Sequence, residues 1–174
     1  RLASPIFKLG ISELKILQLL KLKRLLKREN IDLEIIVSTD IKKILLFLKG
    51  KKDIISHVRS KKLASDNSLQ SLINLAPKLC KNNFILWTHV TSPLFDEKEY
   101  LNFIKEFFKK KNNSAFSSSI INKFLMNHKK QWISHDYKKL KWPKTQDLKK
   151  IYEVNSAAFI AKKEIYELNK DRLD

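Results

Sequence analysis

Residues 83–100 read NFILWTHVTSPLFDEKEY, and this stretch decides the fold class. The continuous apolar run Phe84-Ile85-Leu86-Trp87 has the length and composition of a strand that is buried on both faces. A polar loop follows up to Pro93, and Asp96 with Glu99 has the spacing of a capping box that starts a helix. Open α/β sheets bind ligands in the loops that follow such strands. The stretch alone leaves two interpretations open, a ligand site and a plain connection.

Strand and helix patterns alternate on both sides of this stretch. Apolar or β-branched runs predict strands, and apolar residues at helical spacing predict helices. We expect strands at residues 34–39, 54–58, 84–88, 114–121 and 151–161, and helices at residues 13–27, 41–48, 68–79, 96–110 and 163–168. This order predicts an α/β fold, a mostly parallel Rossmann-like sheet flanked by helices. A chain of 174 residues is long enough for one domain with its own core, residues 1–174.

Capping signals place the ends of the first two helices. Ser12 is the expected cap of the first helix and Asp40 of the second, and Gly50 fits a left-handed stop after the second. The first helix shows a broad apolar face, with its lysines expected on the opposite side. The residues of that face are Leu14, Ile16, Leu17, Leu20, Leu22 and Leu25.

The alternation of strands and helices stops after Asn122. Residues 124–126 and 131–133 are short apolar segments around a polar turn, and they predict a small hairpin. We therefore expect an insertion at residues 122–145 within the single domain.

Composition limits the classes of protein. The single Cys80 excludes a disulfide framework and a cysteine-based metal site, which fits a reducing, cytoplasmic location. No apolar run has the length of a membrane span, so no membrane partner is expected.

The net charge of +18 raises a nucleic-acid-binding module as an alternative of another class. Only five of the 36 basic residues are arginines, however, and arginine is the residue that reads bases and binds phosphates bidentately. The lysines are also spread along the whole chain. We interpret the charge mainly as a compositional bias toward lysine.

Four motifs occur in a fixed order: EIIVSTD at residues 34–40, RSKKLASDNS at 59–68, LWTHVTSPL at 86–94 and PKTQDLKKIYEVNSAAFI at 143–160. Together they resemble the motifs of the acylneuraminate cytidylyltransferases, or CMP-N-acetylneuraminic acid synthetases, over residues 12–167. The resemblance implies a magnesium-dependent nucleotidyltransferase of the nucleotide-diphospho-sugar transferase type. Such an enzyme joins a sialic-acid-like nine-carbon acidic sugar to CMP, uses CTP and releases pyrophosphate. It also implies a role in nucleotide-sugar and lipopolysaccharide biosynthesis, and a homodimer formed through the hairpin.

The resemblance assigns site residues by position. For the nucleotide they are Arg1, Arg59 and Ser68, and for the sugar they are His89, Thr91, Ser92, Lys144, Gln146 and Asn155. The catalytic residue stays unassigned, with His89 as the candidate general base. No residue of the sequence is assigned to the metal.

Several positions depart from the family pattern. His89 and Val90 replace the usual Gln-Pro, Lys144 replaces an arginine, and Ser156 replaces a glycine. The family's phosphate loop is matched only by its start, Arg1-Leu2-Ala3-Ser4, and its C-terminal metal-binding segment has no match. Two further alternatives therefore stay open, a catalytically dead homologue and a nucleotidyltransferase of the 3-deoxy-manno-octulosonate type.

Overall fold

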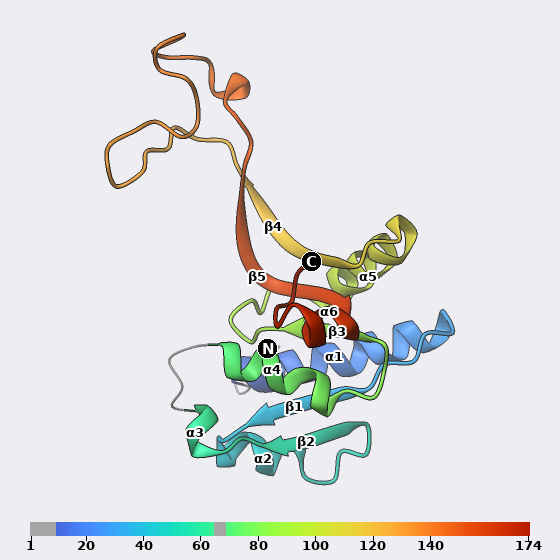
Figure 1. Ribbon diagram of the computed structural model, residues 1–174. Coiled ribbons are helices and arrows are strands. Elements are labelled where there is room, and N and C mark those ends of the chain that lie inside the picture. The colour runs from blue at the N-terminus through green and yellow to red at the C-terminus, as the bar shows by residue number, and fades with distance from the viewer. Residues whose placement is uncertain (1–9, 65–68) are drawn as a thin grey trace, which may run out of the picture. The chain divides into compact units, whose positions relative to one another are not determined.

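The computed structural model describes residues 10–64 and 69–174, which form a mixed α/β fold (Figure 1). The chain divides into two compact units. The first unit comprises Arg1–Phe116 and Ala157–Asp174, and the second comprises Ser117–Ser156. In the described residues, no helix combines the length and the apolar character that a membrane crossing requires.

Two separate sheets carry the strands of the described residues. The first sheet pairs β1 (Ile35–Thr39) with β2 (Ile54–Val58) in parallel. The second sheet has the order β3 (Phe84–Thr88), β5 (Ile151–Lys162), β4 (Ser114–Ile121), and β3 runs antiparallel to β5. The strand positions agree with the sequence-based expectation.

The expected mostly parallel sheet is only partly matched. Parallel neighbours need a crossover connection, which is usually a helix. Between β4 and β5 the described chain forms only a short 3₁₀ helix, η2 (Thr145–Asp147). Hydrophobic periodicity marks a strand but carries no information about its direction, so this part of the topology was not accessible from the sequence.

The helices of the first unit are α1 (Ile11–Arg28), α2 (Lys42–Leu48), α3 (Lys61–Ala64), α4 (Gln70–Leu79), α5 (Glu97–Lys110) and α6 (Lys163–Leu168). Asp96 caps α5 as predicted, because its carboxylate accepts hydrogen bonds from the backbone N–H groups of Lys98 and Glu99. Gly50 has the expected positive φ of 82°.

The other two predicted caps are wrong. Gly10, not Ser12, precedes α1, and no side chain caps that end. At α2 the side chain of Thr39 accepts the hydrogen bond from Ile41 N at 3.1 Å, while Asp40 is exposed. Helix α2 begins one residue later than expected, so Ile41, whose side chain has no acceptor, stands at the N-cap in place of Asp40.

The buried face of α1 differs from the predicted one. Besides Ile16, Leu22 and Leu26, it includes Lys15, which is 2% exposed, and Gln18. The expectation that all lysines lie opposite the apolar face is therefore wrong for Lys15. Polar groups of a neighbouring loop accept its hydrogen bonds, and this makes its burial possible.

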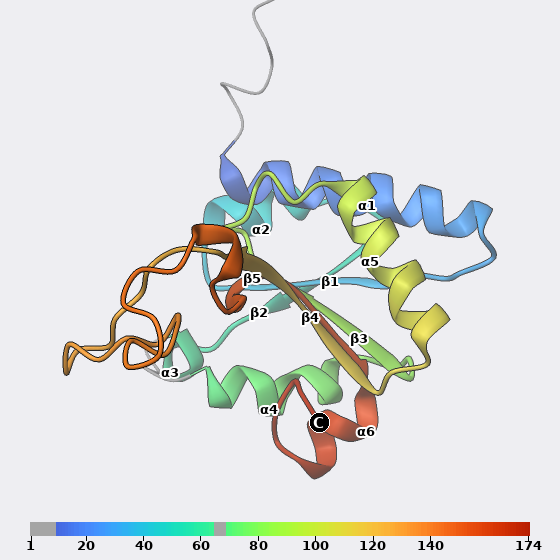
Figure 2. The same ribbon diagram turned by 90° about the horizontal axis from the view of Figure 1, so that it is seen from above.

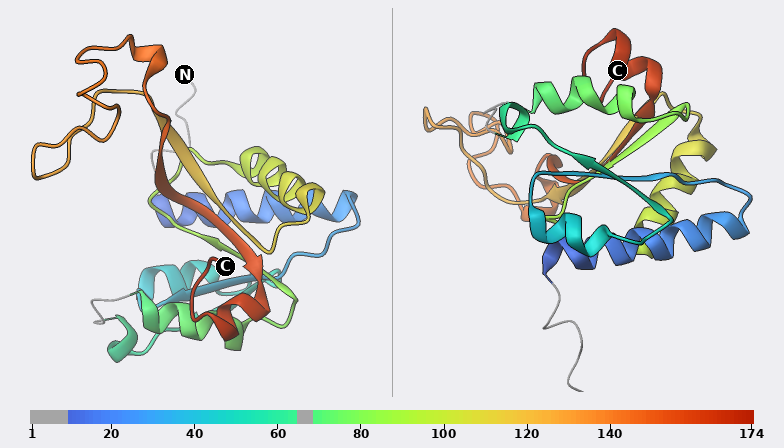
Figure 3. Two further views of the ribbon diagram at one scale, coloured as in Figure 1. Left: turned by 45° about the horizontal axis from the view of Figure 1, so that its top comes forward. Right: turned by 90° about the horizontal axis from the view of Figure 1, so that it is seen from below.

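Among the residues that the structure describes, three apolar clusters hold the first unit together. One joins Leu22 and Leu26 of α1 to α5 and β5, and a second joins Ile16 of α1 to β1, β2 and α2. The third packs α4 and α6 against Ile85 of β3 and Ala161 of β5. Helix α1 thus contributes to the core of both sheets, and Figures 2 and 3 show α1 and α4 on opposite sides of the strands.

The second unit is held by an aromatic cluster and by side-chain hydrogen bonds. A single antiparallel bridge joins Met126 to Trp132, where the sequence predicts a hairpin. The aromatic cluster consists of Phe124, Trp132, His135, Tyr137 and Trp142. Ser134 is fully buried, and its hydroxyl oxygen accepts a hydrogen bond from Leu125 N at 3.2 Å, which joins the two sides of this loop.

Candidate functional site

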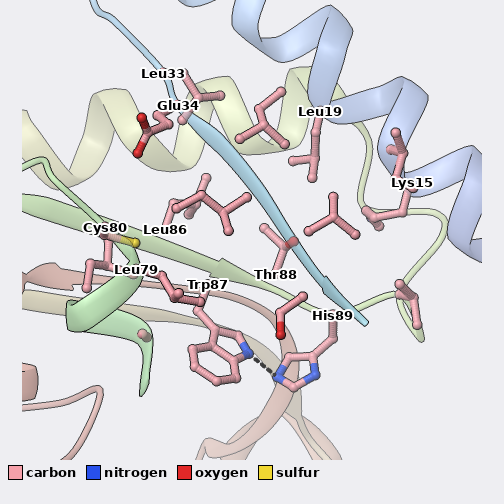
Figure 4. A pocket seen from close by; sticks show the side chains of 18 of the residues that line it. Lys15, Leu19, Leu33, Glu34, Leu79, Cys80, Leu86, Trp87, Thr88 and His89 are labelled. Atoms are coloured by element: carbon pink, nitrogen blue, oxygen red, sulfur yellow. Dashed lines mark hydrogen bonds between the residues drawn. The ribbon is translucent and has the colours of Figure 1, made fainter. Parts of the chain in front are cut away.

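An apolar cavity of about 660 Å³ lies between β1 and β3 in the first unit (Figure 4). Helix α1 contributes Leu19 to its lining, and α4 contributes Leu72 and Leu75.

Polar groups gather at one end of this cavity, where the carboxyl ends of β1, β2 and β3 meet. Ser38, Arg59, Thr88 and His89 line this end. Arg59 directly follows β2, and its Nη2 donates a 2.6 Å hydrogen bond to the carbonyl oxygen of Ser38. The Nε of Arg59 is buried and has no hydrogen-bond partner among the described residues. A buried guanidinium N–H that lacks an acceptor is suited to receive one from a ligand.

His89 is held as a neutral imidazole. Its Nε2 lies 3.0 Å from Trp87 Nε1, an obligate donor, and 3.4 Å from Nη1 of Arg172 (Figure 4). Burial lowers the pKa of His89 below its ordinary value of 6.5, and the Arg172 charge lowers it further. Because two donors face Nε2, the ring proton belongs on Nδ1. His89 is therefore arranged to donate a hydrogen bond rather than to remove a proton.

Arg172 is a site component that the sequence analysis missed. Its guanidinium carbon lies 3.8 Å from the ring centroid of Phe159 and 5.5 Å from that of Trp87. Stacking on two rings holds the cation next to His89, and within residues 10–64 and 69–174 no carboxylate pairs with it. Its segment, Asp-Arg-Leu-Asp at residues 171–174, is polar and has no periodicity, so no sequence signal pointed to this contact.

Two side chains of α1 hold the loop after β3 in place by hydrogen bonds. Lys15 Nζ donates to the carbonyl oxygens of Ser92 and Phe95, both at 2.8 Å, and lies 3.2 Å from the hydroxyl of Tyr100. Gln18 Nε2 donates to the Pro93 carbonyl oxygen at 2.8 Å. Burial lowers the pKa of Lys15 from 10.5 to about 8. These bonds tie the Thr-Ser-Pro segment to a rigid helix.

The spacing of apolar residues in the sequence indicates that Lys15 lies on the buried face of the first helix. It precedes Leu19, Leu22 and Leu26 by four, seven and eleven residues, which places it on the same helix face as these leucines. A lysine in that phase must either extend beyond the core or find acceptors inside it. The structure shows the second outcome.

Of the three predicted nucleotide-binding residues, one lies among the residues that the structure describes. Arg1 and Ser68 lie outside the described residues, while Arg59 lines the cavity. Among the predicted sugar residues, His89 also lines the cavity, and Thr91 and Ser92 lie in the clamped loop. The structure thus brings Arg59 and His89 to one cavity.

The remaining predicted sugar residues belong to the second unit. Lys144 and Gln146 are exposed, and Lys144 directly precedes η2. The Asn155 amide accepts a 2.6 Å hydrogen bond from Ser117 Oγ and donates one to Ser119 Oγ at 3.1 Å. Ser156, at the position of the family's glycine, has a left-handed φ of 57°, a conformation that favours glycine.

The described residues offer no metal site. Within residues 10–64 and 69–174, no three His, Cys, Asp or Glu side chains come together to hold an ion. Comparisons with known proteins give no independent identification, since neither a family model nor a curated protein matches the chain.

Proposed function

We propose that the protein is a nucleotidyltransferase that activates a sialic-acid-like nonulosonate with CTP. The observation that carries the proposal is the meeting of Arg59 and His89 at the carboxyl ends of β1, β2 and β3. Ligands of Rossmann-like α/β proteins bind at this edge, and two of the four motifs supply these residues. We propose that the fold is Rossmann-like on the same ground, the position of Arg59 and His89 at this edge.

The groups of the first unit suit binding and orientation. Arg59 offers to an oxygen of the nucleotide base or ribose a buried Nε–H that has no acceptor in the described part of the chain. His89 offers Nδ1–H to a sugar oxygen, and the exposed Thr91 adds a hydroxyl in the loop that Lys15 fixes.

The proposed reaction is an in-line displacement at the α-phosphorus of CTP. The sugar hydroxyl oxygen forms the new P–O bond, the bond to the bridging oxygen of pyrophosphate breaks, and the hydroxyl proton leaves to solvent. Magnesium would neutralise charge on the departing pyrophosphate. The described residues supply no ligand set for it, so no residue of the chain is assigned to the metal.

The test is pyrophosphate release from CTP and Mg²⁺ with a panel of acidic sugars, nonulosonates and 3-deoxy-manno-octulosonate among them. We expect release with one nonulosonate, and a loss of at least about tenfold in kcat/KM for Arg59→Ala, equivalent to about 1.4 kcal/mol. Arg24→Ala, an exposed arginine on α1, is the matched control and should retain activity.

Two outcomes would contradict the proposal. One is the absence of pyrophosphate release with every sugar of the panel. The other is tight binding of DNA or RNA without CTP binding, which would favour the nucleic-acid interpretation of the +18 charge. Activity only with 3-deoxy-manno-octulosonate would keep the reaction class and change the substrate.

A further inference from the structure

The guanidinium group of Arg172 lies beside His89 at the edge of the candidate site. Its Nη1 is 3.4 Å from Nε2 of His89, a residue that lines the polar end of the cavity. In residues 10–64 and 69–174, no ion pair includes Arg172. The side chain is half-buried, and a cation that has lost part of its water shell is stabilised most by an anionic partner.

Most N–H groups of this guanidinium remain available to a ligand. The neutral ring of His89 offers one lone pair, on Nε2, and Trp87 Nε1 donates to it at the shorter distance of 3.0 Å (Figure 4). The Nη1 group of Arg172 therefore has only a long, shared contact with that nitrogen. The buried Nε of Arg172 has no hydrogen-bond partner within the described residues. An N–H group in this state requires an acceptor.

Two aromatic rings fix the direction of the Arg172 side chain. Trp87 of β3 and Phe159 of β5 are direct neighbours across the antiparallel pair, so both rings stand on the same face of the sheet. The ring of His89 lies 6.0 Å from that of Trp87 and 6.4 Å from that of Phe159, between centroids. The guanidinium stacks on the two aromatic rings and thus stays next to the imidazole.

The backbone is held on both sides of Arg172. Before it, the carbonyl oxygen of Lys170 accepts a 2.6 Å hydrogen bond from Gln70 Nε2 of α4. After it, the backbone N–H of Asp174 donates to Ser114 Oγ of β4 at 3.2 Å. The guanidinium is therefore positioned before any ligand arrives, which lowers the entropic cost of binding.

This arrangement suits a carboxylate. One carboxylate accepts two parallel N–H bonds from one guanidinium, a geometry that arginine offers and lysine does not. In the ring form of a nonulosonate, the carboxylate and the attacking hydroxyl are attached to the same carbon atom. His89, which donates through Nδ1–H, and Arg172 are adjacent donors and can bind these two groups together.

We propose that Arg172 binds the carboxylate of the acidic sugar and makes the site specific for acidic over neutral sugars. This inference rests on the proposed function, because it takes the acidic sugar as the substrate. It assigns the carboxylate to a residue that lies outside the four motifs, in the segment after α6.

The test is a titration of the product of the complete gene, followed by NMR of the Arg172 Nε–H and Trp87 Nε1–H signals. Magnesium is left out so that no transfer takes place, and CTP is present in one series and absent in the other. The probes are N-acetylneuraminate and the other acidic sugars of the panel, each compared with its uncharged methyl ester. We expect one acid to shift the Arg172 signal and to bind at least about tenfold more tightly than its ester. Equal affinities for acid and ester, or no binding of any probe in either series, would overturn the proposal.

Variants separate recognition of the carboxylate from a structural role of Arg172. Arg172→Gln removes the charge, Arg172→Lys keeps the charge without the fork, and Arg24→Gln on the exposed surface of α1 is the matched control. We expect Arg172→Gln to bind acid and ester within about threefold of each other, Arg172→Lys to keep part of the preference, and Arg24→Gln to keep all of it. A structural role would weaken acid and ester equally, so a preference for the acid that persists in Arg172→Gln would overturn the proposal.

Pyrophosphate release by the same variants distinguishes a failure of this proposal from a failure of the proposed function. Acid-selective binding through Arg172 without release of pyrophosphate supports the carboxylate site and contradicts nucleotidyl transfer. Where release occurs, we expect Arg172→Gln to raise the KM for the sugar at least about tenfold and to leave the KM for CTP within about twofold. A rise in the KM for CTP alone would mean that Arg172 binds the nucleotide, which would overturn the proposal and leave nucleotidyl transfer intact.

Discussion

Replacing Lys15 by methionine tests whether this buried ammonium group fixes the loop after β3. Methionine keeps an unbranched side chain of similar length but cannot donate to Ser92 O, Phe95 O or the Tyr100 hydroxyl. Losing two hydrogen bonds from a charged donor to carbonyl oxygens costs about 3–6 kcal/mol. The variant also removes the cost of burying the Lys15 charge. This offsets about 3 kcal/mol of the loss, since burial lowers the pKa of Lys15 from 10.5 to about 8.

The expected net effect of Lys15→Met at pH 7 is a loss of about 1.5 kcal/mol in the free energy of unfolding, measured by urea denaturation. Lys21→Met is the matched control, because Lys21 lies on the same helix with its side chain 61% exposed and, among the described residues, makes only an ion pair with Glu97. The control should lose less than about 0.5 kcal/mol.

The pH dependence gives a second, sharper result. Between pH 8 and 10.5 the unfolded state binds more protons than the folded state, because only the unfolded Lys15 keeps its ordinary pKa. Wild-type stability should therefore rise with pH across this window, by up to about 3 kcal/mol relative to Lys15→Met. A gap between the two proteins that is constant or narrows as the pH rises, or equal losses for Lys15→Met and Lys21→Met, would refute the reasoning.

Three further predictions follow from single contacts. Asp96→Ala should lower the free energy of unfolding in urea by about 1 kcal/mol, because α5 loses its cap. Asp40→Ala should change it by less than about 0.5 kcal/mol, because Asp40 does not cap α2. Equal effects of the two variants would contradict the capping assignment. Tyr166→Phe should be neutral or stabilising, since the buried Tyr166 hydroxyl has no hydrogen-bond partner among the described residues. Tyr100→Phe should lower the free energy of unfolding by about 1–3 kcal/mol, because the Tyr100 hydroxyl donates to Ala157 O. A larger loss for Tyr166→Phe than for Tyr100→Phe would show that the partners are misassigned. Burial lowers the folded-state pKa of His89 below 6.5, so below that pH the unfolded state binds more protons than the folded state. The free energy of unfolding should therefore fall as the pH drops through 6.5, and His89→Gln should lack this part of the loss. A pH profile of His89→Gln that equals that of the wild type would count against a neutral, buried His89.

The strands were predictable from the sequence because each is a short apolar run with clear ends. The runs at residues 84–88 and 54–58 match β3 and β2 to the residue. The cap at Asp96 was predictable for the same local reason, since it precedes a long amphipathic helix directly. Asp40 failed because α2 begins one residue later than the pattern predicts, with Ile41 at its N-cap.

The contacts of the candidate site were less predictable, because they join residues that are far apart in the chain. Arg172 stacks on Trp87 across 85 positions of sequence, and Lys15 donates to Ser92 across 77. Local patterns do not encode such contacts. His89 was found through its motif, but its neutral, hydrogen-bond-donating form depends on Trp87 and Arg172 and became visible only in the structure.

The direct test of nucleotidyl transfer is identification of the product. Wild-type protein with CTP, Mg²⁺ and the panel of nonulosonates is analysed by mass spectrometry for a sugar joined to CMP, with Arg59→Ala and Arg24→Ala in parallel. We predict one CMP-linked acidic sugar with wild type and Arg24→Ala, and a strong loss of product with Arg59→Ala. Absence of any CMP-sugar from the wild-type reaction, or equal yields from wild type and Arg59→Ala, would contradict the proposed function and the site assigned to it.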